Sequence, residues 1–185
     1  GNRSPVLTAA AWRPLPCRPT TGSITVFAGL RGQGVYRSVD SGNSWQRVSP
    51  DGWVVVALAL SPAYAQDGTV FVTEGMWPTG YRLQRSTDEG LTWQDKSPGW
   101  TDLPSPPGLA ISPGFATDRT LYVVGGTQTF RSTDGGDTFA RPGGWFATHA
   151  VAALAFSPAY ETDDTLFALV PDEGLHKSVD GGTSW

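Results

Sequence analysis

An eight-residue pattern that occurs four times constrains this chain more than any other feature of its sequence. The pattern reads Ser-x-Asp-x-Gly-x-Ser/Thr-aromatic, and its copies begin at Ser38, Ser86, Ser132 and Ser178. The starts are 48, 46 and 46 residues apart. A regular period of this length indicates a repeat protein, in which each unit buries its apolar surface against its neighbours.

Two further elements repeat in register with the octapeptide. One is an apolar segment followed by Ser-Pro and an aromatic residue, at residues 58–64, 109–115 and 154–160. The other is a short segment of threonine and apolar residues, at residues 24–27, 69–72, 120–123 and 165–168. Each unit therefore reads as four short strands, separated by turns rich in Gly, Pro and Asp.

These units predict an all-β chain. The first strand, such as Val54 to Leu60, is a nearly continuous apolar run, which is typical of a strand buried on both faces. The second is rich in β-forming residues, and no stretch shows a sustained helical period. A repeat of about 45–50 residues with four strands is typical of a propeller blade. We therefore predict that residues 1–185 form a single domain, an all-β propeller of four-stranded antiparallel blades. The predicted blades are at about residues 6–53, 54–104, 105–149 and 150–185.

The two ends of the sequence raise the question of ring closure. A segment ending in Ser-Pro follows Trp45 and Trp93, whereas Trp185 is the last residue given. Residues 1–5, Gly-Asn-Arg-Ser-Pro, resemble the segment that the last unit lacks, and they could complete its blade and remove an exposed strand edge. The alternative, which we favour, is that the chain is part of a longer array. A homodimer could also complete a larger propeller.

With its residues and spacing, the octapeptide resembles the Asp-box, also called the bacterial neuraminidase repeat. The resemblance covers all four units, with Phe139 in place of the usual Trp. Asp-boxes occur in the propellers of sialidases, xyloglucan-degrading endoglucanases, sortilin-type receptors and photosystem II assembly factors. The resemblance therefore implies the propeller fold and leaves the function open.

The residue types of the octapeptide predict a structural turn. Aspartate can accept hydrogen bonds from turn amides, glycine permits a left-handed backbone, and the aromatic ring can pack beneath the turn. Calcium binding or acid catalysis by the four Asp residues is the alternative. The residues to which we assign the structural role are Asp40, Gly42, Trp45, Asp88, Gly90, Trp93, Asp134, Gly136, Phe139, Asp180, Gly182 and Trp185.

Tryptophans in the loops at one end of the predicted blades are the candidate ligand-binding residues. Flat indole faces beside carboxylates suit a sugar ring, and Trp is also a favoured anchor in protein interfaces. Packing between blades is the alternative, because a repeating core also produces repeated Trp. The candidates are Trp53, Trp77, Trp100, Trp145, Glu74 and Tyr81, with Trp77 favoured because it lies in a non-repeated insertion.

Composition excludes several classes of partner and cofactor. The formal charge of −4 argues against nucleic acid, and the longest apolar run of eight residues is too short for membrane insertion, which takes about 20. The single Cys17 allows no disulfide within the chain and no Cys-based metal site. His149 and His176 cannot form a multi-His metal site alone, so we expect neither a metal nor a cofactor.

We therefore predict a non-catalytic binding or scaffold module that recognises a protein or a glycan on the Trp-bearing face. A glycosidase needs two carboxyl groups flanking the bond, and nothing in the spacing of the carboxylates selects a pair. Two alternatives stay open: a fragment of a xyloglucanase-like or sialidase-like glycoside hydrolase, and an assembly or structural factor without a small ligand. Resemblance to exported proteins and the scarcity of cysteine favour an extracellular or periplasmic location.

Overall fold

The computed structural model describes residues 7–11, 23–76, 80–97, 99–100 and 105–185. In these residues the chain is mostly β and forms four antiparallel sheets of three or four strands, so the prediction of the structural class is confirmed. None of the helices in this part of the chain is long and apolar enough to span a bilayer.

The four sheets are numbered here in chain order. Sheet 1 contains β1 (Leu7–Ala11), β2 (Val26–Leu30), β3 (Gly34–Ser38) and β4 (Gln46–Arg47). Sheet 2 contains β5 (Val55–Leu60), β6 (Val70–Met76), β7 (Gly80–Ser86) and β8 (Gln94–Asp95). Sheet 3 contains β9 (Gly108–Ile111), β10 (Leu121–Gly125) and β11 (Gln128–Ser132). Sheet 4 contains β12 (Ala153–Phe156), β13 (Leu166–Val170) and β14 (Gly174–Ser178).

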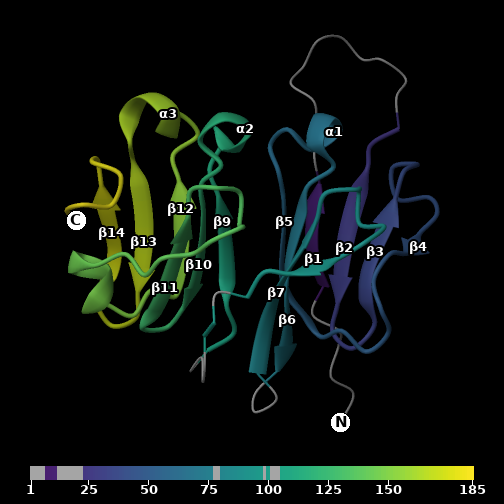
Figure 1. The fold of residues 1–185 in the computed structure, drawn as a ribbon, viewed down its shortest axis with the longest axis horizontal. Coiled ribbons are helices and arrows are strands. Elements are labelled where there is room, and N and C mark those ends of the chain that lie inside the picture. The colour runs from purple at the N-terminus through teal and green to yellow at the C-terminus, as the bar shows by residue number, and fades with distance from the viewer. Residues whose placement is uncertain (1–6, 12–22, 77–79, 98, 101–104) are drawn as a thin grey trace.

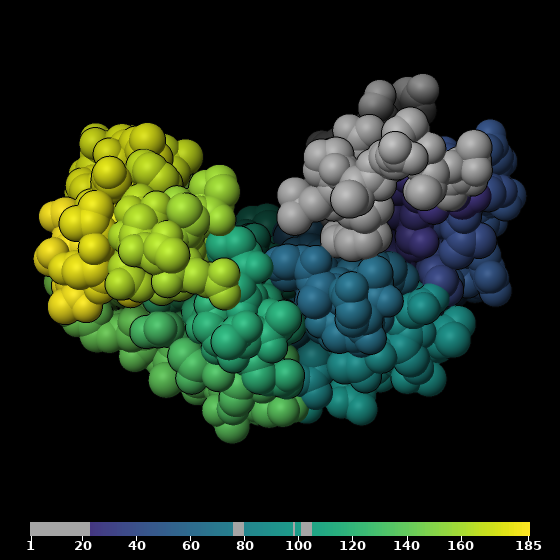
Figure 2. Space-filling model, turned by 90° about the horizontal axis from the view of Figure 1, so that it is seen from above, coloured from purple at the N-terminus to yellow at the C-terminus, as the bar shows by residue number. Residues whose placement is uncertain are grey.

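The sheets lie side by side in chain order (Figure 1). Their first strands, β1, β5, β9 and β12, contact one another in succession. Short one-turn helices follow the first strand of sheets 2, 3 and 4, and a 3-10 turn precedes sheet 4. They are α1 (Tyr64–Asp67), α2 (Phe115–Asp118), α3 (Tyr160–Asp163) and η1 (Gly144–Ala147). Seen from above, the row of sheets is curved (Figure 2), an arrangement that resembles part of a propeller.

Each gap between neighbouring sheets holds its own apolar cluster. Alternate residues of a strand point to opposite faces, so Val70 and Val72 of β6 pack toward sheet 1 while Phe71 packs toward sheet 3. The same alternation sends Tyr122 of β10 toward sheet 4 and Val123 toward sheet 2. The strand buried on both faces is thus the second of the unit. The expectation that it would be the first is wrong, because most residues of β5 are only partly buried, whereas every residue of β10 is buried.

The aromatic residue of the Ser-Pro element packs between units, as expected. The ring of Tyr64 meets Phe27 of sheet 1 edge-on, with the ring centres 5.5 Å apart. Phe115 meets Phe71 of sheet 2 in the same way at 5.9 Å. These contacts link α1 and α2 to the preceding sheet.

Sheet 3 corrects the prediction of a four-stranded blade in every unit. The position of its fourth strand is reduced to a single bridge between Arg131 and Ala140. Pro142 lies three residues after Phe139, whereas Pro50 lies five residues after Trp45. Because proline lacks an N–H and cannot extend a ladder, pairing in sheet 3 ends early. In sheet 4 the given sequence ends at Trp185, where this strand would begin.

A second repeated turn, which the sequence analysis missed, follows each first strand. In the turn that holds α1, Ser61 Oγ donates to Asp67 Oδ2 at 2.6 Å and the N–H of Thr69 donates to Asp67 Oδ1 at 2.8 Å. The same bonds form in the next two units, with the residues Ser112, Asp118 and Thr120, and Ser157, Asp163 and Thr165. Each of these three units therefore carries two carboxylate-centred turns, this one and the octapeptide.

Candidate functional site

The carboxylate of each octapeptide accepts hydrogen bonds from its own turn. Asp88 accepts from the N–H of Thr92 at 2.8 Å, from the Thr92 hydroxyl at 2.6 Å and from the Ser86 hydroxyl at 2.7 Å. The other three units repeat this pattern, with Asp40 bound to Ser44, Asp134 to Thr138 and Asp180 to Ser184. Bonds of this kind hold a tight turn and supply a physical reason for the repeated residue types.

The glycine of the octapeptide lets the turn approach the preceding sheet closely. Gly90 has a φ of 90°, and a Cβ there would lie 3.3 Å from Phe27 Cε1 of sheet 1. Gly136 has a φ of 89°, and a Cβ there would lie 3.0 Å from Phe71 Cε1 of sheet 2. A side chain would therefore be strained by the backbone and crowded by the neighbouring core.

Three of the four octapeptide aromatics pack against a core cluster, and Trp45 is the exception. Trp93, Phe139 and Trp185 contact the clusters in the gaps between sheets. Trp93 also links two sheets, because its Nε1 donates to Val48 O of sheet 1 at 2.7 Å. Trp45 is 43% exposed, and its Nε1 donates to Gly42 O within the same turn.

Hydrogen bonding lowers the pKa of the octapeptide carboxyls. The bonds from Ser44 lower the pKa of Asp40 from its ordinary value of 3.8 to about 2, and those from Ser184 lower the pKa of Asp180 to about 2. Thr92 lowers the pKa of Asp88 in the same way. The folded chain thus holds these protons less tightly than the unfolded chain, so stability is present above the unfolded pKa and is lost as the pH falls through the folded one.

We expect the melting temperature to fall as the pH is lowered from about 4 to about 2, with little change from pH 7 to 5. An Asp88→Asn variant should show a shallower acid dependence, because one of the titrating groups is gone. Thermal unfolding followed by circular dichroism at each pH measures both. An equal acid dependence in the variant and the parent would contradict this role of the turn.

The candidate residues Trp53 and Trp100 lie in different gaps. Trp53 is half-buried between sheets 1 and 2, edge-on to Trp93 with ring centres 5.5 Å apart and planes at 69°. Trp100 lies between sheets 2 and 3, edge-on to Phe130 at 5.8 Å. Its Nε1 donates to the carbonyl of Tyr81 at 2.6 Å, and the Tyr81 side chain is buried. The two indoles therefore line separate places, and Trp77 lies outside the described residues.

The candidate Trp145 belongs to an aromatic cluster at the gap between sheets 3 and 4. Its ring stacks on His149 at 4.3 Å and on Trp185 at 4.5 Å. Glu173 Oε2 lies 3.5 Å from His149 Nε2 and 3.4 Å from His176 Nε2. This cluster joins the turn at η1 to the hairpin of β13 and β14, and it is separate from Trp53 and Trp100.

A groove of about 470 Å³ lies between the edge of sheet 1 and sheet 2. In this groove the candidate residue Trp53 lies beside polar side chains. Trp53 and Trp93 supply its indoles, and the amides of Gln46 and Gln84 line it. The other lining residues are Arg47, Val48, Ser49, Pro50, Leu91 and Thr92.

The candidate Glu74 does not line the groove itself but is hydrogen-bonded to Gln84, which does. Gln84 Nε2 donates to Glu74 Oε1 at 3.3 Å, so the carboxylate orients the amide that lines the groove. Burial raises the pKa of the Glu74 carboxyl, and the bond from Gln84 opposes this. No sequence signal marks Gln46, Gln84 or the second role of Trp93, because glutamine belongs to no motif here and Trp93 is already assigned to the octapeptide turn.

The chain was compared with protein families, curated proteins and solved structures. No family model matches it. A xyloglucanase of Hypocrea jecorina (strain QM6a) is 30% identical over an alignment of 140 residues, which covers 62% of this chain and 16% of that enzyme. The chain therefore spans a small part of that relative's length.

Two solved structures are similar at low identity. The YCF48 bound to D1 peptide has a TM-score of 0.46 and 13% identity, covering 98% of this chain and 70% of that one. The YCF48 from Cyanidioschyzon merolae has a TM-score of 0.48 and 15% identity, covering 91% of this chain and 59% of that one. At these scores the two similarities carry no argument about what this chain does.

Proposed function

We propose that the chain is part of a β-propeller, with Asp-box turns at the octapeptides, and that it acts as a non-catalytic module binding a glycan in the groove beside Trp53. The observation that carries the proposal is the pairing of two indoles with amide side chains in one groove. The similarity of part of the chain to a xyloglucanase favours a polysaccharide as the ligand.

The groove has the chemistry that an uncharged sugar needs. The indole of Trp53 offers apolar ring surface, on which the C–H face of a sugar can pack. The exposed amide of Gln46 can donate and accept hydrogen bonds, which suits hydroxyl groups that do both. Gln84 is buried, and its Nε2 donates to Glu74. Ligand sites commonly combine apolar walls with a few polar groups of this kind.

The same groove lacks the parts of a glycosidase active site. Hydrolysis requires two carboxyl groups on either side of the glycosidic bond. None of the described residues that line the groove is Asp or Glu, and Glu74 is bonded to Gln84. A hydrolase fragment is therefore the weaker proposal, and its activity would depend on residues elsewhere.

A protein partner is the second candidate, and one observation favours it. Leu169 and Leu175 lie opposite each other in β13 and β14 and are 45% and 71% exposed. They form apolar surface on sheet 4, which a protein, further sheets of a longer chain or a second copy could cover. We also propose an extracellular or periplasmic location, which is compatible with both candidates.

We expect Trp53→Ala to weaken binding of xyloglucan oligosaccharides about tenfold or more, because it removes the main apolar wall of the groove. Gln46→Ala should weaken binding several-fold without affecting folding, since Gln46 is exposed on the edge strand. Isothermal titration calorimetry measures both affinities, and circular dichroism checks the fold.

Trp100→Ala is the matched control, because it removes an equivalent half-buried indole from the neighbouring gap. It should leave the affinity unchanged. The proposal fails if the parent chain binds no xyloglucan oligosaccharide, or if Trp100→Ala weakens binding as much as Trp53→Ala does.

A further inference from the structure

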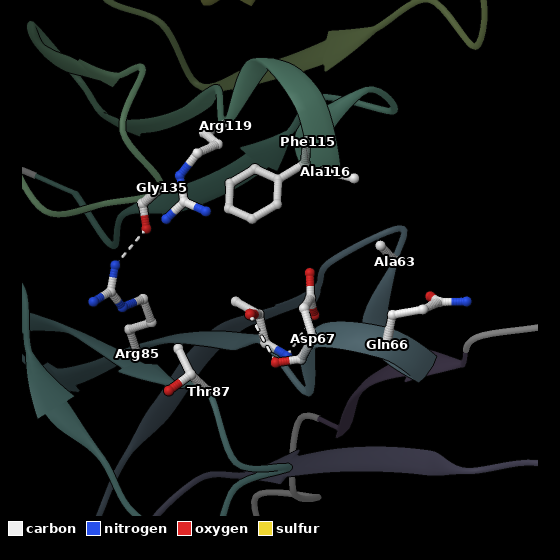
Figure 3. Close-up of a pocket in the computed structure, with 10 residues that line it drawn as sticks. Ala63, Gln66, Asp67, Arg85, Thr87, Phe115, Ala116, Arg119 and Gly135 are labelled. Atoms are coloured by element: carbon white, nitrogen blue, oxygen red, sulfur yellow. Dashed lines mark hydrogen bonds between the residues drawn. The ribbon is translucent and has the colours of Figure 1, made fainter.

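A second cavity, of about 350 Å³, lies between sheets 2 and 3 beside α1 and α2. Its charged lining residues are Arg85, Arg119 and Asp67. Figure 3 shows both guanidinium groups close to Gly135, with the ring of Phe115 beside Arg119 and the side chain of Asp67 across the cavity. The cavity is separate from the groove beside Trp53.

Arg85 is held in place and still keeps a free donor. Its side chain is 11% exposed, and it donates to Gly135 O and to Asp137 Oδ1, each at 2.8 Å. Its Nε is buried without a hydrogen-bond partner, a costly state for a charged donor. Arg37 and Arg131 share this feature in the other gaps, so two further differences distinguish the cavity.

The first difference is the loss of a hydroxyl. Phe115 occupies the position at which the neighbouring units carry Tyr64 and Tyr160. Burial raises the pKa of Tyr64, and the charge of the nearby Arg37 partly offsets this, so in that gap a phenol oxygen lies near a guanidinium without a hydrogen-bond partner of its own. Beside Arg85 no such oxygen is present, because phenylalanine has none.

The second difference is an added cation. Arg119 occupies the position at which the neighbouring units carry Gly68 and Asp164. It is exposed, and its Nη2 donates to Asp134 O at 3.2 Å. A guanidinium has five N–H donors in a planar fork, so Arg119 has donors to spare for a bidentate contact with an oxyanion.

The balance of charge selects the kind of anion. Two arginines and one aspartate line the cavity, and Asp137, which pairs with Arg85, also pairs with Lys96, so these charged side chains together sum to a single positive charge. Asp67 is already bonded to Ser61 and Thr69, which keeps it in its own turn. One net positive charge matches a carboxylate better than a phosphate group, which carries about −1.5 to −2 near pH 7.

We propose that this cavity binds the carboxylate of a small organic acid. Arg119 donates hydrogen bonds to both carboxylate oxygens, and Arg85 Nε donates to one of them. The oxygen would stand where a phenol oxygen stands in the other units. Phe115 and two alanines, Ala63 and Ala116, give the carbon part of the acid an apolar surface. A plain dicarboxylic acid and a sugar acid present the same group, and the test separates them.

Arg119→Gly is the informative variant, because Gly68 occupies the equivalent position and the φ of 51° at Arg119 suits glycine. Titration calorimetry with glutarate and with glucuronate should show binding to the parent chain and a loss of about tenfold or more in the variant. Whichever acid binds more tightly identifies the source of the carboxylate. The melting temperature should not fall.

Two further variants complete the design. Asp164→Gly, the same change of a left-handed residue in the next unit, should leave the affinity unchanged. Phe115→Tyr returns the missing oxygen to the cavity and should weaken binding. The proposal is overturned if neither acid binds, if inorganic phosphate binds as tightly as the acids, or if Arg119→Gly and Asp164→Gly have equal effects. D-glucose should not bind here, which distinguishes this cavity from the groove beside Trp53.

Discussion

Phe71→Ala is expected to lower the free energy of unfolding by about 3–5 kcal/mol, the usual cost of emptying a buried aromatic site. Phe71 is fully buried in the gap between sheets 2 and 3, where it meets Phe115 and limits the approach of Gly136. The cavity left behind would touch both sheets, so it cannot close by a local shift. Urea unfolding followed by tryptophan fluorescence measures the change.

Leu175→Ala is a suitable control, because Leu175 is 71% exposed on the free face of sheet 4. Its cost should stay within about 0.5 kcal/mol. A loss below about 1 kcal/mol for Phe71→Ala would show that the gaps between sheets contribute little to stability, contrary to the packing described here.

Gly136→Ala is the second change expected to be severe, at about 2–3 kcal/mol. Two costs add in this variant. The φ of 89° strains any residue with a Cβ, and that Cβ would press on Phe71 Cε1 at 3.0 Å. Denaturant unfolding again gives the free energy.

Gly32→Ala separates the two costs. Gly32 has a φ of 79°, and a Cβ there would meet nothing within 4 Å. This variant should therefore show the backbone strain alone, about 1–2 kcal/mol. Equal losses in the two variants would mean that the octapeptide turn does not pack against the neighbouring sheet.

Much of this architecture could be predicted from the sequence, because it depends on local chemistry that repeats. The four copies of the octapeptide predict four sheets, as the structure has them. The turn-forming character of Asp88 and Gly90 follows from residue type alone. The packing of Tyr64 against the preceding sheet could also be foreseen. These features involve residues close in the chain or equivalent in every unit.

The two candidate sites could not be predicted from the repeat, because they depend on contacts between units and on residues that differ from unit to unit. The groove forms because the edge strand β4 of one unit lies beside the octapeptide of the next, which brings Gln46 near Trp93. The cavity depends on single departures from the repeat, Phe115 where the neighbouring units carry tyrosine, and Arg119 where they carry Gly68 and Asp164. Recurrence in the sequence indicates Trp100 and Trp145 and gives no weight to these departures, although a unit that differs from its neighbours is a natural place for a specific role.

The order of strands within each sheet has a consequence for how the protein is made. In every sheet the hydrogen-bonded neighbours follow one another along the chain, and none of the described sheets borrows a strand from a distant unit. Each sheet can therefore assemble from hairpins as soon as its own segment has left the ribosome. The next segment can then pack against the sheet that has already folded, so the sheets can form one after another during synthesis from the N-terminus.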